Sequence, residues 1–305
     1  MNMDGRSDFP ERLTVEIGSS CNLQCVMCPR QVIEGMAGMM DIELYRKVVI
    51  EANDHLPVTL VPFFRGESLL HPHFLEMMKV AKEADLGPIQ LTTNAMLLDK
   101  QVAEELVAIG IDFISFSLDV LGKEAYEATR IGGNYGRVVR NIERFLDIRA
   151  ARHSSIPEVQ ISAVETEENR AMMTAFIDYW GERGDRVRVY PEHSADGVLG
   201  SIRGGKDLPS FEKRLPCRKV FSDMVICWNG DVAICNHDWD RREYIGNIGD
   251  TTIGEIWRGE KYREIRQRHN DGELENDATC SGCDHWKMYY IPEGMIGRLY
   301  SRVQV

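Results

Sequence analysis

Three cysteines near the amino end have types and spacing suited to chemistry. Cys21, Cys25 and Cys28 form a Cys-x3-Cys-x2-Cys pattern. They supply three thiolates, whereas a cubic iron–sulfur cluster has four irons. Clusters that only transfer electrons normally have every iron ligated by the protein. An iron left open can bind a substrate or cofactor, so the pattern predicts a [4Fe–4S] cluster at which a reaction takes place.

Two other interpretations of these cysteines have less support. A zinc knuckle needs four ligands, and no His or further Cys lies within twenty residues after Cys28. Disulfides belong to exported proteins, and the first residues contain no apolar stretch of a signal peptide. All eight cysteines lie at positions 21–28 or 217–283. This usage is typical of thiols in a reducing, cytoplasmic compartment.

The composition excludes some classes of partner. The 305 residues are 43% hydrophobic and 28% charged, as in ordinary globular proteins. No run of about 18 apolar residues would span a membrane. The formal net charge of −12 argues against binding to nucleic acid, which such a surface repels. That charge is compatible with a cationic substrate, but solubility alone accounts for it.

The middle of the chain alternates predicted strands and helices. Stretches with helical periodicity separate six short apolar runs, and Asp41 and Asp99 are suitable N-caps for two of the helices. This alternation predicts a parallel α/β sheet whose ligands bind at the carboxyl ends of the strands. Six repeats are too few for an eight-stranded barrel, which leaves a doubly wound sheet or an open partial barrel. The predicted strands are Leu13–Ile17, Val58–Phe64, Ile89–Thr93, Phe113–Leu118, Val159–Ala163 and Val187–Tyr190.

On the cysteine trio after the first strand, the chain resembles the radical S-adenosylmethionine (SAM) superfamily. The resemblance implies a partial (β/α)6 parallel barrel over residues 1–200. It implies that the open iron binds the methionine part of SAM. An electron from a donor such as a flavodoxin or ferredoxin then cleaves SAM, giving a 5′-deoxyadenosyl radical that abstracts hydrogen from a substrate. The cofactor carries out the difficult step, and the protein supplies position and excludes water.

The resemblance extends to the ends of the next strands. Phe64-Arg65-Gly66-Glu67 is similar to the family's Gly-Gly-Glu motif, with Arg65 in place of the first Gly. Gly66 permits close backbone approach, and the resemblance implies that Glu67 accepts hydrogen bonds from the SAM ammonium group.

Further SAM contacts are expected at other positions of the same edge. The family usually has an aromatic residue before the third cysteine, where this chain has Met27, and a flexible thioether can pack on adenine. Residues after the third strand contact the ribose in relatives, and those after the fourth surround the ribose or the carboxylate. The corresponding residues here are Thr92, Thr93, Asn94, Ser117 and Asp119.

The carboxyl-terminal cysteines predict a second metal site. Asn229-Gly230 is typical of a two-residue hairpin loop, which pairs Cys227 with Val232 and Met224 with Cys235. Alternation then places Cys235 with Met224, Ile226 and Trp228, and Cys227 on the other face with Val225, Val232 and Ile234. The two thiols therefore belong to different sites. Four ligands remain for zinc or an iron–sulfur cluster, namely Cys217, Cys235, Cys280 and Cys283.

The spacing of these four cysteines resembles the SPASM-type extension in its short "twitch" form. The resemblance implies one auxiliary [4Fe–4S] cluster, and thus two clusters in all, in a small α+β unit that contains the hairpin. Residues 201–216 would link this unit, residues 217–305, to the barrel. The spacing is similar to that of 2-deoxy-scyllo-inosamine dehydrogenase and of twitch epimerases.

The sequence favours epimerisation by a narrow margin. Cys227 is left without a ligand role, and a thiol facing the barrel mouth can return hydrogen to a substrate radical. The alternatives are two-electron dehydrogenation through the auxiliary cluster, a peptide-modifying epimerase or maturase, and an electron-transfer protein. About a dozen residues precede the first strand, which favours a small aminosugar or aminocyclitol over a peptide substrate. Glu192 and His193 are weaker candidates for substrate contact.

Overall fold

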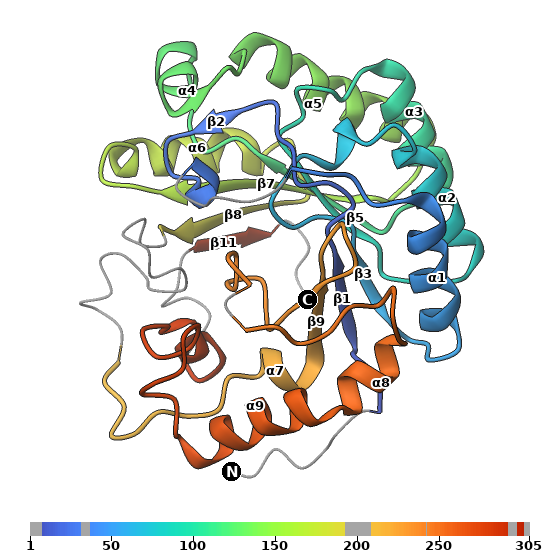
Figure 1. The fold of residues 1–305 in the computed structure, drawn as a ribbon. Coiled ribbons are helices and arrows are strands. Elements are labelled where there is room, and N and C mark those ends of the chain that lie inside the picture. The colour runs from blue at the N-terminus through green and yellow to red at the C-terminus, as the bar shows by residue number, and fades with distance from the viewer. Residues whose placement is uncertain (1–7, 32–36, 193–208, 242, 292–297, 302–305) are drawn as a thin grey trace.

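The computed structural model describes residues 8–31, 37–192, 209–241, 243–291 and 298–301. Its centre is a strongly curved sheet with helices on the outer face (Figure 1). Six parallel strands coincide with the six predicted ones and confirm the α/β parallel-sheet fold. A single bridge between Leu60 and Ile89 joins the second strand to the third. In spatial order the six are β1 (Arg12–Val15), β3 (Thr59–Val61), β4 (Gln90–Thr93), β5 (Phe113–Ser117), β7 (Glu158–Glu165) and β8 (Arg186–Pro191).

Local signals account for some of the helix boundaries on the outer face. The Asp41 carboxylate accepts hydrogen bonds from two backbone N–H groups at the start of α1, and the Asp99 carboxylate accepts one, from Val102, at the start of α3. Gly110, in the left-handed region at φ 73°, ends α3. No described helix is long and apolar enough to cross a membrane. The helices are α1 (Ile42–Asn53), α2 (Phe74–Glu83), α3 (Lys100–Ile109), α4 (Lys123–Thr129), α5 (Tyr135–Ala151) and α6 (Met173–Gly181).

Two helical segments differ from the sequence-based expectation. The helix expected from Glu168 begins only at Met173, because Arg170–Met172 forms a 3-10 turn before it. The short helix α4 was not expected at all. It ends immediately before Arg130, a residue that proves important at the site.

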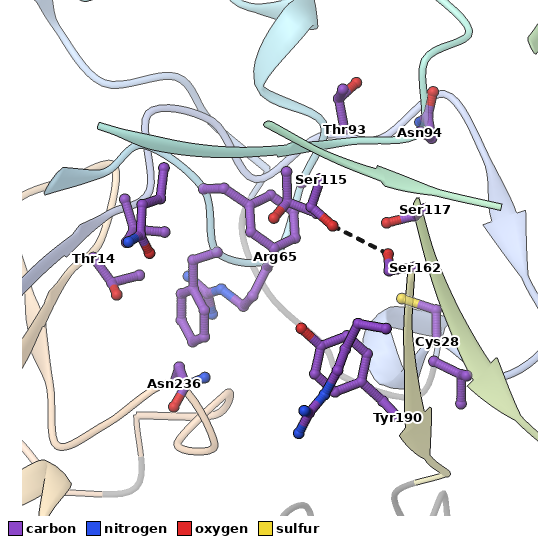
Figure 2. Close-up of a pocket in the computed structure, with 18 of the residues that line it drawn as sticks. Thr14, Cys28, Arg65, Thr93, Asn94, Ser115, Ser117, Ser162, Tyr190 and Asn236 are labelled. Atoms are coloured by element: carbon purple, nitrogen blue, oxygen red, sulfur yellow. Dashed lines mark hydrogen bonds between the residues drawn. The ribbon is translucent and has the colours of Figure 1, made fainter. Parts of the chain in front are cut away.

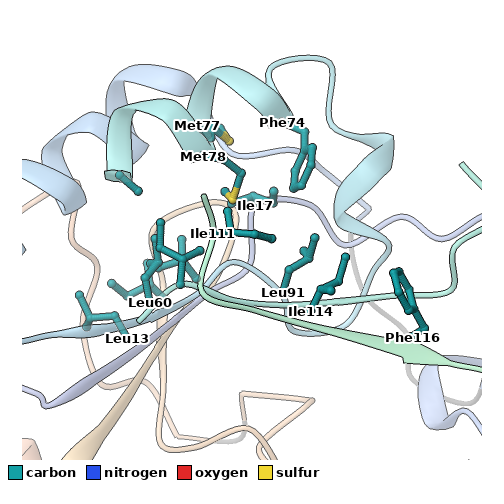
Figure 3. Close-up of a cluster of buried hydrophobic side chains, with 14 of the residues drawn as sticks. Leu13, Ile17, Leu60, Phe74, Met77, Met78, Leu91, Ile111, Ile114 and Phe116 are labelled. Carbon is teal, nitrogen blue, oxygen red and sulfur yellow. The ribbon is translucent and has the colours of Figure 1, made fainter. Parts of the chain in front are cut away.

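The core lies between the sheet and the helices. Met77 and Met78 of α2 pack over Leu60 and Leu91 of the strands, and all four are inaccessible to solvent (Figure 3). Burying a side chain of this size contributes about 1.5–3 kcal/mol. The apolar residues of each strand alternate with polar ones, so the opposite face of the sheet is left for a ligand.

The carboxyl-terminal unit extends the same sheet. Strand β9 (Asp223–Ile226) pairs in parallel with β1, and β10 (Val232–Ala233) pairs antiparallel with β9. At the opposite edge, β11 (Arg298–Ser301) pairs antiparallel with β8. The unit also contains α7 (Lys219–Ser222), α8 (Ile253–Arg258) and α9 (Glu260–Asp271). Part of the predicted linker, residues 201–208, falls outside the described residues, and the domain boundaries stay a prediction.

The predicted register of the hairpin is wrong by one residue. Ile226 pairs with Val232, and the backbone of Cys227 bonds to Asp231, so the loop has three residues. Gly230 at φ 87° supplies the left-handed residue that such a loop needs. Because side chains alternate, the slip transfers β10 residues to the other face. Val232 and Ile234 accordingly join the main core, while Cys227 packs with Val225.

Candidate active site

A cavity of about 1050 Å³ occupies the inner face of the sheet and its carboxyl-terminal edge. Cys21, Cys25 and Cys28 all line it. The loop that carries them leaves the end of β1, as the sequence predicts for a site at the strand ends. Polar side chains from several strands surround the opening, among them Ser115, Ser117, Ser162 and Tyr190 (Figure 2).

The cysteine loop is surrounded by hydrogen-bond donors. The backbone N–H of Leu23 donates to Cys21 Sγ at 3.4 Å, and the Arg130 guanidinium lies 3.8 Å from Cys25 Sγ. Burial raises the pKa of the Cys25 thiol to about 11, although the charge of Arg130 acts against this. Such donors favour thiolates that carry negative charge, as the ligands of an iron–sulfur cluster do. The three residues therefore fit the predicted cluster.

Glycine at position 66 allows two loops to meet. A side chain there would place its Cβ 2.3 Å from the carbonyl oxygen of Gly18 and 2.6 Å from that of Ser20. The next residue, Glu67, donates its backbone N–H to the same Ser20 carbonyl at 2.8 Å. The close approach predicted for Gly66 is therefore made to the chain that leads into the cysteines.

Glu67 is buried and joins two strand ends. Its carboxylate accepts hydrogen bonds from the Thr93 hydroxyl and the Asn94 backbone N–H, both at 2.8 Å. Burial raises the pKa of Glu67, and these hydrogen bonds act in the opposite direction. Asn94 Nδ2 in turn lies 3.9 Å from Cys21 Sγ. Glu67, Thr93 and Asn94 all line the cavity, so the predicted residues do come together.

The sequence analysis did not find the partner of Asp119. Arg130 and Asp119 form a buried ion pair at 2.7 Å. A short antiparallel pair, β2 (Gln24–Cys25) with β6 (Arg130–Ile131), fixes Arg130 beside the cysteine loop. No local pattern marks an arginine after an unexpected short helix, so only the fold reveals it.

The other four predicted ligands surround a separate, small enclosed pocket. Cys217, Cys235, Cys280 and Cys283 line it together with His269. Burial raises the pKa of Cys235 to about 12 and that of Cys217 and Cys283 to about 11. The Cys235 sulfur accepts the backbone N–H of His237 at 3.3 Å. Four clustered thiols with a backbone donor fit a cluster that binds them as thiolates.

Comparison with known families identifies both halves of the chain. The sequence profile of the Radical SAM superfamily matches residues 15–157. The SPASM profile, described as an iron–sulfur cluster-binding domain, matches residues 217–284. The chain carries a radical SAM domain and a SPASM domain. It is a radical SAM enzyme, and these domains imply SAM and iron–sulfur clusters as cofactors; that there are two clusters stays a prediction.

Similar proteins have varied roles. The chain is 27% identical over 296 residues to the tungsten-containing aldehyde ferredoxin oxidoreductase cofactor-modifying protein of Pyrococcus furiosus, covering 83% of this chain and 82% of that one. A structure of BtrN in complex with AdoMet and 2-DOIA has a TM-score of 0.59 at 20% identity, covering 90% and 92% of the two chains. Streptococcus suis SuiB bound to precursor peptide SuiA has a TM-score of 0.70 at 18% identity, covering 92% and 71%. The two structures are similar in fold.

In the radical SAM domain, Arg65 replaces the first glycine of the family motif, and its side chain binds other parts of the protein. Its guanidinium forms two bonds of 2.7 Å to the Glu16 carboxylate, which is 0% exposed. It also donates to the backbone carbonyl of Trp239, at 2.7 Å. Arg65 thus connects β1, the Gly66 loop and the SPASM domain.

Of the remaining predicted SAM and substrate contacts, four line the cavity and one lies outside the described residues. Met27, Thr92 and Ser117 line the cavity of the radical SAM domain, and so does Glu192. His193 lies outside the described residues. Their roles as SAM or substrate contacts stay predictions.

Cys227 does not face the barrel mouth. Its side chain is 0% exposed, and it packs with Phe64, Val225 and Ala233. Burial raises its pKa to about 12. Phe64 lines the cavity, whereas Cys227 does not. Cys227 and Cys235 do lie in different places, as expected, but not through the predicted alternation, because β10 ends at Ala233 before Cys235. The Cys227 thiol lies inside the cavity wall rather than on its surface.

Proposed function

We propose that this radical SAM enzyme oxidises a small hydroxylated substrate by two electrons. When bound, the cluster and SAM supply a 5′-deoxyadenosyl radical in the cavity beside Cys21, Cys25 and Cys28. A substrate carbon that loses hydrogen to this radical must then lose one electron and one proton to become a carbonyl. The residues around the cavity position that carbon and exclude water.

One observation carries this proposal. Lys219 and His237 line both the large cavity and the pocket of the four SPASM cysteines. The SPASM site therefore adjoins the space available to substrate, and the two share these lining side chains. An electron that leaves the substrate therefore has an acceptor site next to it. An external donor such as a flavodoxin or ferredoxin is then needed only for SAM cleavage.

Epimerisation through Cys227 is the second candidate. It requires the thiol to approach a substrate carbon. Phe64 packs in the same hydrophobic group as Cys227, and of these two residues only Phe64 lines the cavity. Oxidation needs no such movement, so the geometry favours it over the epimerisation that the spare cysteine indicates.

The substrate proposal is a small aminosugar or aminocyclitol. The inner wall carries many hydroxyl and amide side chains, such as Thr14, Ser115, Gln160 and Ser162, which suit a polyol. A peptide is the alternative, because SuiB binds the precursor peptide SuiA.

The test is turnover of an aminocyclitol in D2O by the reconstituted, oxygen-free enzyme with SAM and dithionite. Oxidation predicts 5′-deoxyadenosine and a product two mass units lighter, whether or not Cys227 is replaced by Ala. Cys280→Ala, which removes a SPASM ligand, is expected to keep SAM cleavage but lose the oxidised product. Solvent deuterium at an inverted carbon, abolished by Cys227→Ala, would instead establish epimerisation.

A further inference from the structure

The inner faces of three adjacent strands form one polar wall of the cavity. In the parallel ladders, Ser115 of β5 pairs with Gln160 of β7, and Val164 of β7 pairs with Tyr190 of β8. Residues between them point the other way, as the full burial of Ile161 in the core illustrates. We call Ser115, Gln160, Ser162 and Tyr190 the polar wall; all four line the cavity.

The hydrogen bonds within the polar wall run in one direction. Ser162 donates its proton to the carbonyl of Phe116 at 3.3 Å, and Ser115 donates to Ser162 at 3.2 Å (Figure 2). Gln160 Nε2 donates to Ser115 at 2.9 Å and, more weakly, to the Tyr190 phenol oxygen at 3.4 Å. Each hydroxyl has a single proton. Both serine protons are therefore used inside the wall.

Two groups of the polar wall are left for a ligand. Because the Tyr190 oxygen accepts from Gln160, its own proton is available to the cavity. The Gln160 side-chain carbonyl takes no proton from any residue in the described part of the chain, although Gln160 is only 5% exposed. Gln160 lines the cavity, so this oxygen is open to the space in which a ligand binds, and a ligand that donates to it would complete its hydrogen bonding.

Tyr190 also contacts a charged neighbour on its own strand. The Arg188 guanidinium lies 5.4 Å from the centre of the Tyr190 ring, within the range of a cation–π contact. Arg188 lies two residues before Tyr190, on the same inward face of β8. The ring thus has Arg188 on one side and the Gln160 amide at its phenol oxygen.

We infer that Tyr190 and Gln160 bind one hydroxyl group of the substrate and so determine its specificity. A hydroxyl donates one proton and accepts another, which matches the free Gln160 carbonyl and the free Tyr190 proton. A carboxylate has no proton for Gln160, and a substrate without the hydroxyl leaves both groups unpaired. Sites built in this way discriminate strongly against the analogue that lacks the polar group. This inference rests on the proposed function, because it concerns the same cavity.

The experiment measures discrimination rather than affinity alone. The probe is 2-deoxy-scyllo-inosamine, compared with analogues that each lack one hydroxyl, by anaerobic calorimetry on reconstituted enzyme with SAM. We expect the wild type to bind the probe roughly tenfold more tightly than one of the analogues. Tyr190→Phe should abolish that ratio, because it weakens binding of the probe and leaves binding of the analogue unchanged. Tyr190 is 38% exposed, so the variant is expected to fold.

A matched control makes the same change elsewhere. Tyr179 lies on the outer helix α6, and Tyr179→Phe should keep the wild-type ratio. Three results overturn the inference: a ratio retained in Tyr190→Phe, a wild type that treats all analogues alike, or no binding of the probe. Formation of 5′-deoxyadenosine by the wild type with dithionite tests the proposed function separately. Its absence refutes that function whatever the binding ratio shows.

Discussion

At the scale of single residues, this site depends on charged groups that are buried in pairs. Glu16 pairs with Arg65, and Asp119 pairs with Arg130. Arg65, Asp119 and Arg130 line the cavity. A buried charge without its partner is strongly unfavourable. Each pair therefore fixes its two elements together, and the arginine that replaces the family's glycine at position 65 becomes a structural connection to the SPASM domain.

The Glu16–Arg65 pair leads to a stability prediction. Arg65→Met should lower the free energy of unfolding by about 3 kcal/mol, because it leaves a buried carboxylate uncompensated. The double variant Glu16→Leu with Arg65→Met should recover most of that loss. Thermal unfolding of the reconstituted protein, followed by circular dichroism, measures both. Equal losses in the single and double variants would show that the charge is not the cause.

His71 predicts a dependence of stability on pH. Burial lowers its pKa, with Nε2 at 2.9 Å from the Met40 carbonyl and Nδ1 accepting the backbone N–H of His73. Only the neutral ring can make both bonds. Since the folded pKa lies below the unfolded value of about 6.5, this contribution is present above pH 6.5 and is lost as the pH falls. Denaturant titrations at several pH values should show that the free energy of unfolding falls less below pH 6.5 in His71→Gln than in the wild type. The same dependence of this free energy on pH in both proteins would contradict the assignment.

At the scale of elements, the site is made by loops that must lie very close together. The Gly66 loop after β3 touches the chain at Gly18–Ser20 after β1, and the Glu67 carboxylate then holds the end of β4. Strand order alone places these loops at one edge. The absence of a side chain at position 66 sets the distance between them.

Gly66→Ala tests this contact. The new Cβ would lie 2.3 Å from a backbone oxygen, so the cysteine loop has to move. We expect less iron bound per chain and less 5′-deoxyadenosine than in the wild type. Gly136→Ala in α5 is the matched control, because its Cβ would meet the end of the flexible Arg140 side chain at 3.2 Å and the Asn134 side-chain oxygen at 3.8 Å, and no backbone atom. Normal iron loading of Gly66→Ala would rule out the proposed constraint.

At the scale of the whole molecule, the two domains share one sheet and one helix cap. Strand β9 of the SPASM domain pairs with β1, and Glu51 of α1 accepts the backbone N–H groups of Ile253 and Gly254 at the start of α8, both at 2.8 Å. The contact that brings the SPASM pocket beside the cavity is therefore part of the core architecture rather than a flexible linkage.

A truncation tests that continuity. The fragment 1–216 lacks β9 and leaves the edge of β1 unpaired, and open edges of this kind promote aggregation. We expect it to be aggregated or to unfold without a cooperative transition, as judged by size-exclusion chromatography and thermal melting. A monomeric fragment with a sharp transition would mean that the radical SAM domain folds independently.

The sequence by itself determined the six parallel strands, the edge at which the site lies and the division of seven cysteines between two places, because spacing and periodicity are local properties. It missed Arg130 and the role of Arg65, and it placed Cys227 on the wrong surface. Those outcomes depend on contacts between segments far apart in the chain, such as the packing of Phe64 with Cys227. Only the tertiary structure decided which side chains reach the cavity, since burial and pairing of charge are settled when the strands close around it.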